Sequence, residues 1–115
     1  MKVSILENSP VLVRISLCGE LNASEASQVE QELSSLLTGI QRSVVLDVSE
    51  VSKMTSLGIS VLIRVYNQLK RRGLKLVLFK PQESVAEVLK LSRLSEILNV
   101  VRTDSELMGK LRESD

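Results

Sequence analysis

The sequence predicts an α/β domain with a mixed sheet of four or five strands and helices mainly on one face. Short apolar, β-branched runs alternate along the chain with longer segments of helical periodicity. The segment 43–79 reads as strand, helix and strand, which is a βαβ unit with parallel strands and a right-handed crossover. The chain has 115 residues, of which 43% are hydrophobic. This length and composition predict one domain, residues 1–115, with one core.

The first part of the chain predicts two strands and a helix. A strand over 2–7 and a strand over 11–17 are separated by the turn residues Asn8, Ser9 and Pro10. The second strand has the cleaner alternation, so we expect one face to carry Val11, Val13, Ile15 and Leu17. A helix then runs from Asn22, a good N-cap, to Gly39. Its expected buried stripe is Ala26, Val29, Leu33, Leu36 and Leu37.

The central part predicts a buried strand over 44–48, a short polar turn and a long helix from Ser56 to Gly73. Ser56 suits the N-cap position, because its hydroxyl can accept a hydrogen bond from a free helical N–H. Leu62 and Ile63 should face the sheet, while Arg64, Asn67 and Lys70 should face water. The stripe behind this expectation comprises Ile59, Leu62, Ile63, Tyr66 and Leu69.

The last part predicts a strand over 74–79, a short helix over 84–91 and a final strand over 99–102. Leu94, Ile97 and Leu98 form a short apolar cluster between the last two of these elements. Asp104 is expected to cap a final helix. The apolar side of that helix would carry Leu107, Met108 and Leu111.

Three residues at predicted strand-to-helix junctions are candidates for a site. A hydroxyl at Ser56 would lie beside free backbone N–H groups and the positive end of a helix dipole, which favour a phosphate there. Ser56 can equally be a plain cap. Asp47 follows a strand that is predicted to be parallel, at the sheet edge where ligands usually lie, but it can also be a simple loop or cap carboxylate. Asn22 occupies a comparable junction and can likewise be only a helix cap.

The composition excludes several functions. The chain has no His and one Cys, so zinc sites of ordinary ligands and Ser-His-Asp or Cys-His catalytic sets are excluded. No phosphate-binding glycine loop is present, and we expect no enzyme activity, metal or cofactor. The net charge of +1 does not favour nucleic acid as a partner. No apolar run reaches the roughly 20 residues that cross a membrane. Cys18 cannot form a disulfide within the chain, which suits a cytoplasmic location.

Two motifs resemble those of the anti-sigma factor antagonists of the STAS domain family. The run Met54-Thr55-Ser56-Leu57-Gly58-Ile59-Ser60 is similar to the family's Met-Asp-Ser-(Ser/Ala/Thr)-Gly-Leu-Gly, which follows a Val-Leu-Asp-Leu-Ser strand. Gly19-Glu20-Leu21-Asn22 resembles the family's Gly-Glu-Leu-Asp. The resemblance extends over about Val3 to Leu111. Three positions depart from the pattern, where Thr55, Leu57 and Ser60 replace an Asp, a small residue and a Gly.

The resemblance implies a single STAS-like domain that works as a phosphorylation switch. Its unmodified form would bind a kinase-type anti-sigma factor and free the sigma factor. Phosphorylation by that serine kinase would end the binding, and a serine phosphatase would reverse it. The family motif places the phosphate on Ser56 rather than Thr55. The implied contact residues are Asn22, Thr55, Ser56, Leu57 and Gly58.

A second interpretation also fits the resemblance. The chain could be a STAS accessory subunit of a lipid or solute transport complex that is not phosphorylated. Thr55 and Ser56 would then only contact a neighbouring subunit. The replacement of the family Asp and the bulk of Leu57 keep this alternative open.

Overall fold

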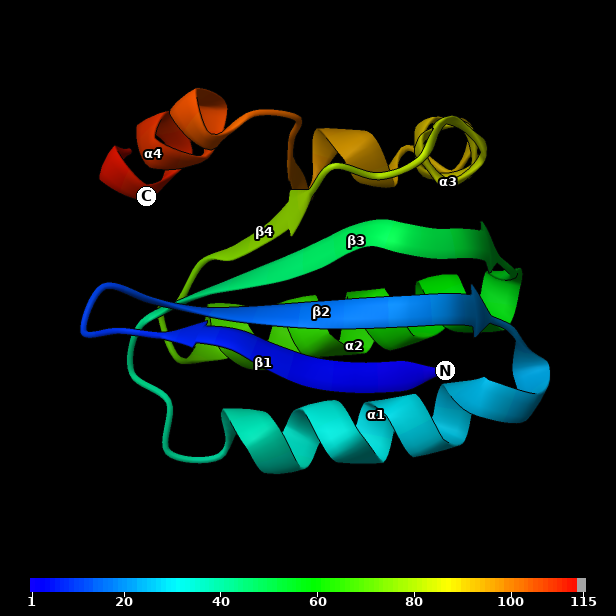
Figure 1. Cartoon of the computed structure of the whole chain (residues 1–115), viewed down its shortest axis with the longest axis horizontal. Helices are drawn as coiled ribbons and strands as arrows, with labels where there is room; N and C mark the ends of the chain where they lie inside the picture. Colours follow the sequence, from blue (N-terminus) through cyan, green and yellow to red (C-terminus); the bar gives the residue numbers. More distant parts are fainter. Residues whose placement is uncertain (114–115) are drawn as a thin grey trace.

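The computed structural model describes residues 1–113, which form a five-stranded mixed sheet with helices packed against it (Figure 1). The elements in chain order are β1 Lys2–Asn8, β2 Leu12–Leu21, α1 Ala23–Leu37, β3 Ser43–Met54, α2 Ser56–Arg71, β4 Leu76–Phe79, α3 Glu83–Leu91, the 3-10 helix η1 Leu94–Glu96, β5 Asn99–Val101 and α4 Asp104–Arg112. The strands lie in the order β1-β2-β3-β4-β5. Strands β1 and β2 are antiparallel, and every other neighbouring pair is parallel. The predicted α/β class and the parallel pairing of β3 with β4 are confirmed.

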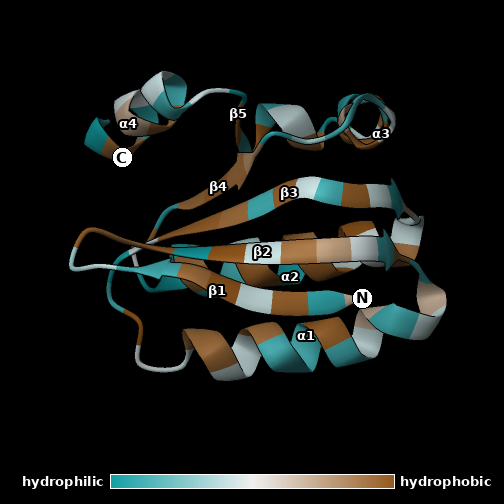
Figure 2. Cartoon of the chain, viewed as in Figure 1, coloured by the Kyte–Doolittle hydropathy of each residue, from teal (hydrophilic) through white to brown (hydrophobic). Residues whose placement is uncertain are grey.

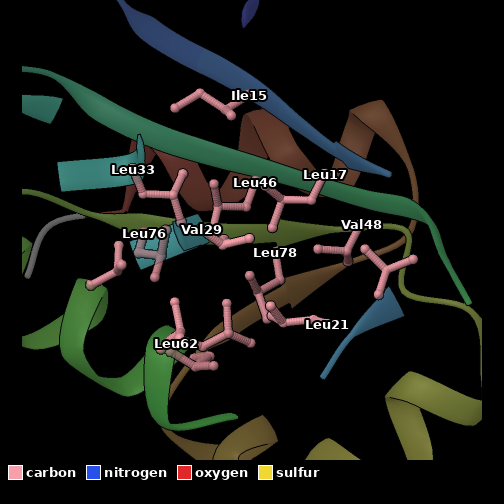
Figure 3. Close-up of a cluster of buried hydrophobic side chains, with 14 of the residues drawn as sticks. Ile15, Leu17, Leu21, Val29, Leu33, Leu46, Val48, Leu62, Leu76 and Leu78 are labelled. Carbon is pink, nitrogen blue, oxygen red and sulfur yellow. The ribbon is translucent and has the colours of Figure 1, made fainter. Parts of the chain in front are cut away.

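The main core lies on the sheet face that α1 and α2 cover. Figure 3 shows Leu33 of α1 and Leu62 of α2 gathered with strand residues such as Leu46 and Leu78. Residues that point to the opposite face, including Phe79 of β4, pack in a smaller cluster with Leu107 of α4. The helices therefore lie mainly on one face, as predicted. Within residues 1–113, no helix has the length and apolar character that crossing a bilayer requires.

Strands β2 and β3 are longer than predicted. Strand β2 continues to Leu21 through Gly19, whose φ of +115° interrupts the regular strand geometry. Strand β3 continues to Met54, and its pairing register with β2 shifts twice, so that β3 holds an extra residue at each shift. These irregularities are β-bulges, which break the alternation that marks a strand in sequence. Figure 2, coloured by hydropathy, shows hydrophilic and hydrophobic residues mixed in the second half of β3.

Asp47 lies inside β3, so its predicted place at the end of that strand was wrong. Its Oδ1 accepts hydrogen bonds from the backbone N and the hydroxyl of Ser49, at 3.0 and 2.6 Å. These bonds hold the first bulge, where Ser16 pairs with Asp47 but Cys18 pairs with Glu50. The Asp47 carboxylate is therefore a local structural group.

Helix α2 is rotated about its axis from the predicted orientation. Leu62 is buried, and Arg64, Asn67 and Lys70 are exposed as expected, but Ile63 is 37% exposed. The residues buried on α2 are Gly58, Val61, Leu62, Val65 and Leu69. The apolar residues of this helix extend around more than half of its circumference. The close approach of Gly58 to Leu21 at the first turn decides which of them face the sheet.

Smaller corrections concern β2 and the C-terminal region. Val11 precedes β2 and is exposed, while the next members of its expected face are buried. Thr103, not Asp104, is the N-cap of α4, because the Thr103 hydroxyl accepts a hydrogen bond from the backbone N of Glu106 at 3.1 Å. Ile97 and Met108 are exposed, although Leu94, Leu98 and Leu107 are buried as expected.

Candidate functional site

The candidate site lies where β2 and β3 end side by side. The two strands are parallel, and Leu21 pairs with Met54 at their carboxyl ends. The helices that follow, α1 and α2, therefore begin next to each other at one edge of the sheet (Figure 1). The backbone N of Thr55 donates to the carbonyl oxygen of Leu21 at 3.0 Å and joins the two junctions. This pairing places Asn22 near the start of α2, although 34 residues separate Leu21 from Thr55.

Asn22 is the N-cap of α1, as predicted. Its Oδ1 accepts hydrogen bonds from the backbone N of Ser24 at 3.1 Å and of Glu25 at 3.3 Å. The Ser24 hydroxyl donates to the same oxygen at 2.7 Å. The first turn of α1 therefore has an internal acceptor for its free N–H groups.

The N-cap of α2 is Thr55, so the predicted cap at Ser56 was wrong. The first intrahelical bond runs from the backbone N of Ile59 to the carbonyl oxygen of Thr55, at 2.9 Å. The Thr55 side chain makes no capping hydrogen bond, and its hydroxyl donates to the Leu21 carbonyl oxygen at 3.4 Å. The first N–H groups of α2 consequently lack the side-chain acceptor that α1 has. They leave a partial positive charge at this helix end.

The first three residues of α2 differ in exposure. Ser56 is exposed, and Leu57 beside it is 50% exposed. Gly58 is buried against β2, where an added Cβ would lie 2.6 Å from the carbonyl oxygen of Leu21 and 2.7 Å from its Cγ. Only glycine allows the first turn of α2 to lie this close to Leu21. Gly58 thus sets the position of α2, while Ser56 and Leu57 face outward.

The predicted site residues therefore divide into exposed and supporting groups. Ser56 and Leu57 are exposed, Asn22 and Thr55 are half-buried, and Gly58 is buried beneath them. The sequence did not indicate the part of Leu21, whose carbonyl oxygen receives both bonds from Thr55. Backbone acceptors carry no residue-type signal, so only the pairing of β2 with β3 reveals this role.

Met54 and Cys18 differ in burial. Met54 is buried and lies under the turn that leads into α2. Cys18 is half-exposed on β2, with its sulfur 3.5 Å from the Ser16 hydroxyl oxygen. Within residues 1–113, no group of three or more His, Cys, Asp or Glu side chains is arranged to hold a metal ion. The site at the start of α2 therefore offers a hydroxyl, uncapped N–H groups and an apolar side chain.

Comparison with known proteins gives one family and several relatives. The family model of the STAS domain matches residues 3–107. The chain is 27% identical to the anti-sigma-B factor antagonist of Listeria monocytogenes over 111 residues, which cover 95% of this chain and 96% of that protein.

The fold is also similar to solved structures. The crystal structure of TM1081 from Thermotoga maritima has a TM-score of 0.83 at 24% identity, over 97% of this chain and 94% of that chain. The anti-sigma factor antagonist SpoIIAA in its unphosphorylated form has a TM-score of 0.76 at 19% identity, covering 96% of both chains. The phosphorylated form of SpoIIAA from Bacillus has a TM-score of 0.69 at 18% identity, over 96% of this chain and all of that chain.

Proposed function

The chain belongs to the STAS domain family, and from this premise we propose that it is an anti-sigma factor antagonist. Its unphosphorylated form binds an anti-sigma factor that is also a serine kinase, and so frees a sigma factor. Phosphorylation of Ser56 ends the binding, and a serine phosphatase restores it. The likeness to the Listeria antagonist over 95% of the chain supports this role. The proposed place of action is the cytoplasm, where sigma factors work.

The observation that carries the proposal is the exposed hydroxyl of Ser56 at the uncapped start of α2. In the proposed reaction the γ-phosphoryl group of ATP moves to the Ser56 oxygen, ADP leaves, and a base of the kinase takes the hydroxyl proton. The product carries about −1.5 to −2 charges at pH 7. Free N–H groups and the helix dipole favour such an anion at this end of a helix. The domain can therefore accept the phosphate without unfolding.

The surroundings of Ser56 support a change in partner binding on phosphorylation. Leu57 is an exposed apolar side chain beside the hydroxyl, so a docked partner would remove water from both. A phosphate within that contact would have to lose its hydration or be repelled. A difference of about 1.4 kcal/mol already weakens binding tenfold. We infer that Asn22, Thr55, Ser56 and Leu57 form the contact surface, and that Gly58 supports it from below.

The geometry also favours Ser56 over Thr55 as the acceptor. The Thr55 hydroxyl is directed to the Leu21 carbonyl oxygen and its side chain is half-buried. A kinase would have to break that contact to reach it. The Ser56 side chain is exposed, and it is the residue that matches the serine of the family motif.

The test is to incubate the protein with a purified anti-sigma factor kinase from its own organism and with ATP, and then to locate phosphate by mass spectrometry. The proposal predicts near-stoichiometric phosphate on Ser56 and none in Ser56→Ala. Ser35→Ala is a matched control, because Ser35 is an exposed serine near the C-terminal end of α1, away from the start of α2. Thr55→Val should still be labelled. Full labelling of Ser56→Ala would show that Ser56 is not the acceptor, and no labelling of the parent protein would favour the transport-accessory alternative.

A further inference from the structure

The part of β3 that leads to Ser56 has a neighbouring strand on one side only. The pairing of β3 with β4 begins at Val44 and ends where Asp47 pairs with Phe79. Strand β3 nevertheless continues to Met54 (Figure 1). Both register shifts between β3 and β2 also fall beyond Asp47. We call residues 48–54 the β3 extension. Its backbone geometry is therefore poorly fixed by the sheet alone.

The start of helix α3 lies beside the open edge of the β3 extension, where a further strand would otherwise pair (Figure 1). The side-chain Nε2 of Gln82 donates to the carbonyl oxygen of Ser49 at 2.9 Å. The hydroxyl of Ser84 donates to the carbonyl oxygen of Ser52 at 3.3 Å. Two backbone acceptors that lack a strand partner on this side are thereby satisfied by side chains.

The Gln82 side chain is used for this contact instead of for its own helix. Gln82 is the N-cap residue of α3, yet its side chain makes no capping hydrogen bond. The helix is meanwhile anchored by Val85 and Leu89, which are buried in the main core. Helix α3 and its N-cap residue, anchored in the core, thus hold two points of the β3 extension, and Ser52 is only four residues before Ser56.

We propose that Gln82 and Ser84 are positioning residues that hold the β3 extension and thereby place the Ser56 hydroxyl. The effect on phosphorylation rests on the proposed function above, whereas the effect on the β3 extension does not. Without these two bonds, the Ser49 and Ser52 carbonyls would turn to water and the extension would open locally more often. Ser56 would then be presented to a kinase in many orientations. Correct orientation of reacting groups is a large part of rate acceleration in such transfers.

The direct test is hydrogen exchange measured by mass spectrometry on the double variant Gln82→Ala/Ser84→Ala. Both residues are exposed, so the variant should fold. We expect amides in 49–57 to exchange about tenfold faster, because two lost hydrogen bonds together amount to roughly the free energy of that factor. Amides in 12–17 should be unchanged. Of the single variants, Ser84→Thr, which keeps the hydroxyl, should protect the amides in 49–57 better than Ser84→Ala does.

The matched control is Ser92→Ala on the same helix. The Ser92 hydroxyl bonds only within α3, to the carbonyl oxygens of Val88 at 2.9 Å and Leu89 at 3.2 Å. This variant should leave exchange in 49–57 unchanged. Equal exchange of 49–57 in the parent and the double variant would overturn the positioning role. So would faster exchange throughout the chain, which would indicate loss of global stability.

Phosphorylation kinetics supply the second measurement. In the double variant we expect kcat for Ser56 phosphorylation to fall several-fold while KM changes little, because docking persists and only orientation is lost. Unchanged kcat alongside faster exchange would show that the hydrogen bonds from Gln82 and Ser84 do not serve the reaction. If the parent protein is not phosphorylated at all, the proposed function fails, and the exchange result still decides whether Gln82 and Ser84 hold the extension.

Discussion

Thr55 and Leu21 are joined by two hydrogen bonds to one carbonyl oxygen. The backbone N of Thr55 donates to it at 3.0 Å and the Thr55 hydroxyl at 3.4 Å. This contact ties the end of β2 to the start of α2. The Thr55 side chain makes no capping hydrogen bond, so the helix presents free N–H groups beside Ser56. An aspartate, which the family motif has at this position, would be a stronger cap.

The first prediction concerns this cap. Thr55→Asp should be more stable than Thr55→Val by about 1 kcal/mol, because the carboxylate can accept from the free N–H groups of α2 and interacts favourably with its dipole. Thr55→Val is the reference, since both variants lose the hydroxyl bond to Leu21. Chemical denaturation at neutral pH measures the difference in the free energy of unfolding. Equal stability of the two variants would show that the start of α2 is not short of an acceptor.

The second prediction concerns Gly58. Gly58→Ala should destabilise the protein by about 1–3 kcal/mol, because the new Cβ would lie 2.6 Å from the Leu21 carbonyl oxygen and force α2 to move. Gly109→Ala in α4 is the control, because nothing lies within 4 Å of a Cβ there. That variant should gain roughly 0.5–1 kcal/mol from helix propensity. A stabilising effect of Gly58→Ala in urea denaturation would contradict the close approach of α2 to β2.

The third prediction tests the rotation of α2 by comparing adjacent residues. Leu62→Ala should cost about 2–5 kcal/mol, the usual range for a fully buried leucine. Ile63→Ala should cost clearly less, about 1 kcal/mol, because Ile63 is 37% exposed and loses less buried surface. Thermal and urea unfolding of both variants measure this. Comparable losses would mean that Ile63 also packs on the sheet.

The sequence predicted most of the fold for physical reasons that can be named. Strand and helix segments differ clearly in periodicity, which gave the order of elements. Asn22 was correctly predicted as a cap, because its amide oxygen accepts hydrogen bonds from N–H groups in the first turn of its own helix. Such local interactions are encoded by neighbouring residues. Leu62 was correctly placed in the core because it belongs both to the predicted apolar stripe of α2 and to the face that the structure buries.

The remaining features depend on contacts between segments far apart in the chain. Thr55 and Ser56 are both suitable caps, and the bond from Thr55 to Leu21 decides between them. The second half of β3 was not predicted, because the bulges break its alternation and its polar residues resemble those of a turn. The side chains of Gln82 and Ser84 donate hydrogen bonds to backbone carbonyls, and backbone acceptors cannot be recognised from the sequence. The exposure and placement of Ser56 are structural findings, while its phosphorylation stays a prediction.

The most direct test of the account is the affinity of the anti-sigma factor for the protein before and after phosphorylation, measured by isothermal titration calorimetry. We predict that phosphate on Ser56 weakens binding at least about tenfold, since a loss of roughly 1.4 kcal/mol suffices for that factor. Ser56→Ala should bind like the parent protein. Ser56→Asp should bind more weakly than the parent but more tightly than the phosphorylated form, because it carries about one charge rather than nearly two. Equal affinities of the phosphorylated and unphosphorylated forms would contradict the proposed switch.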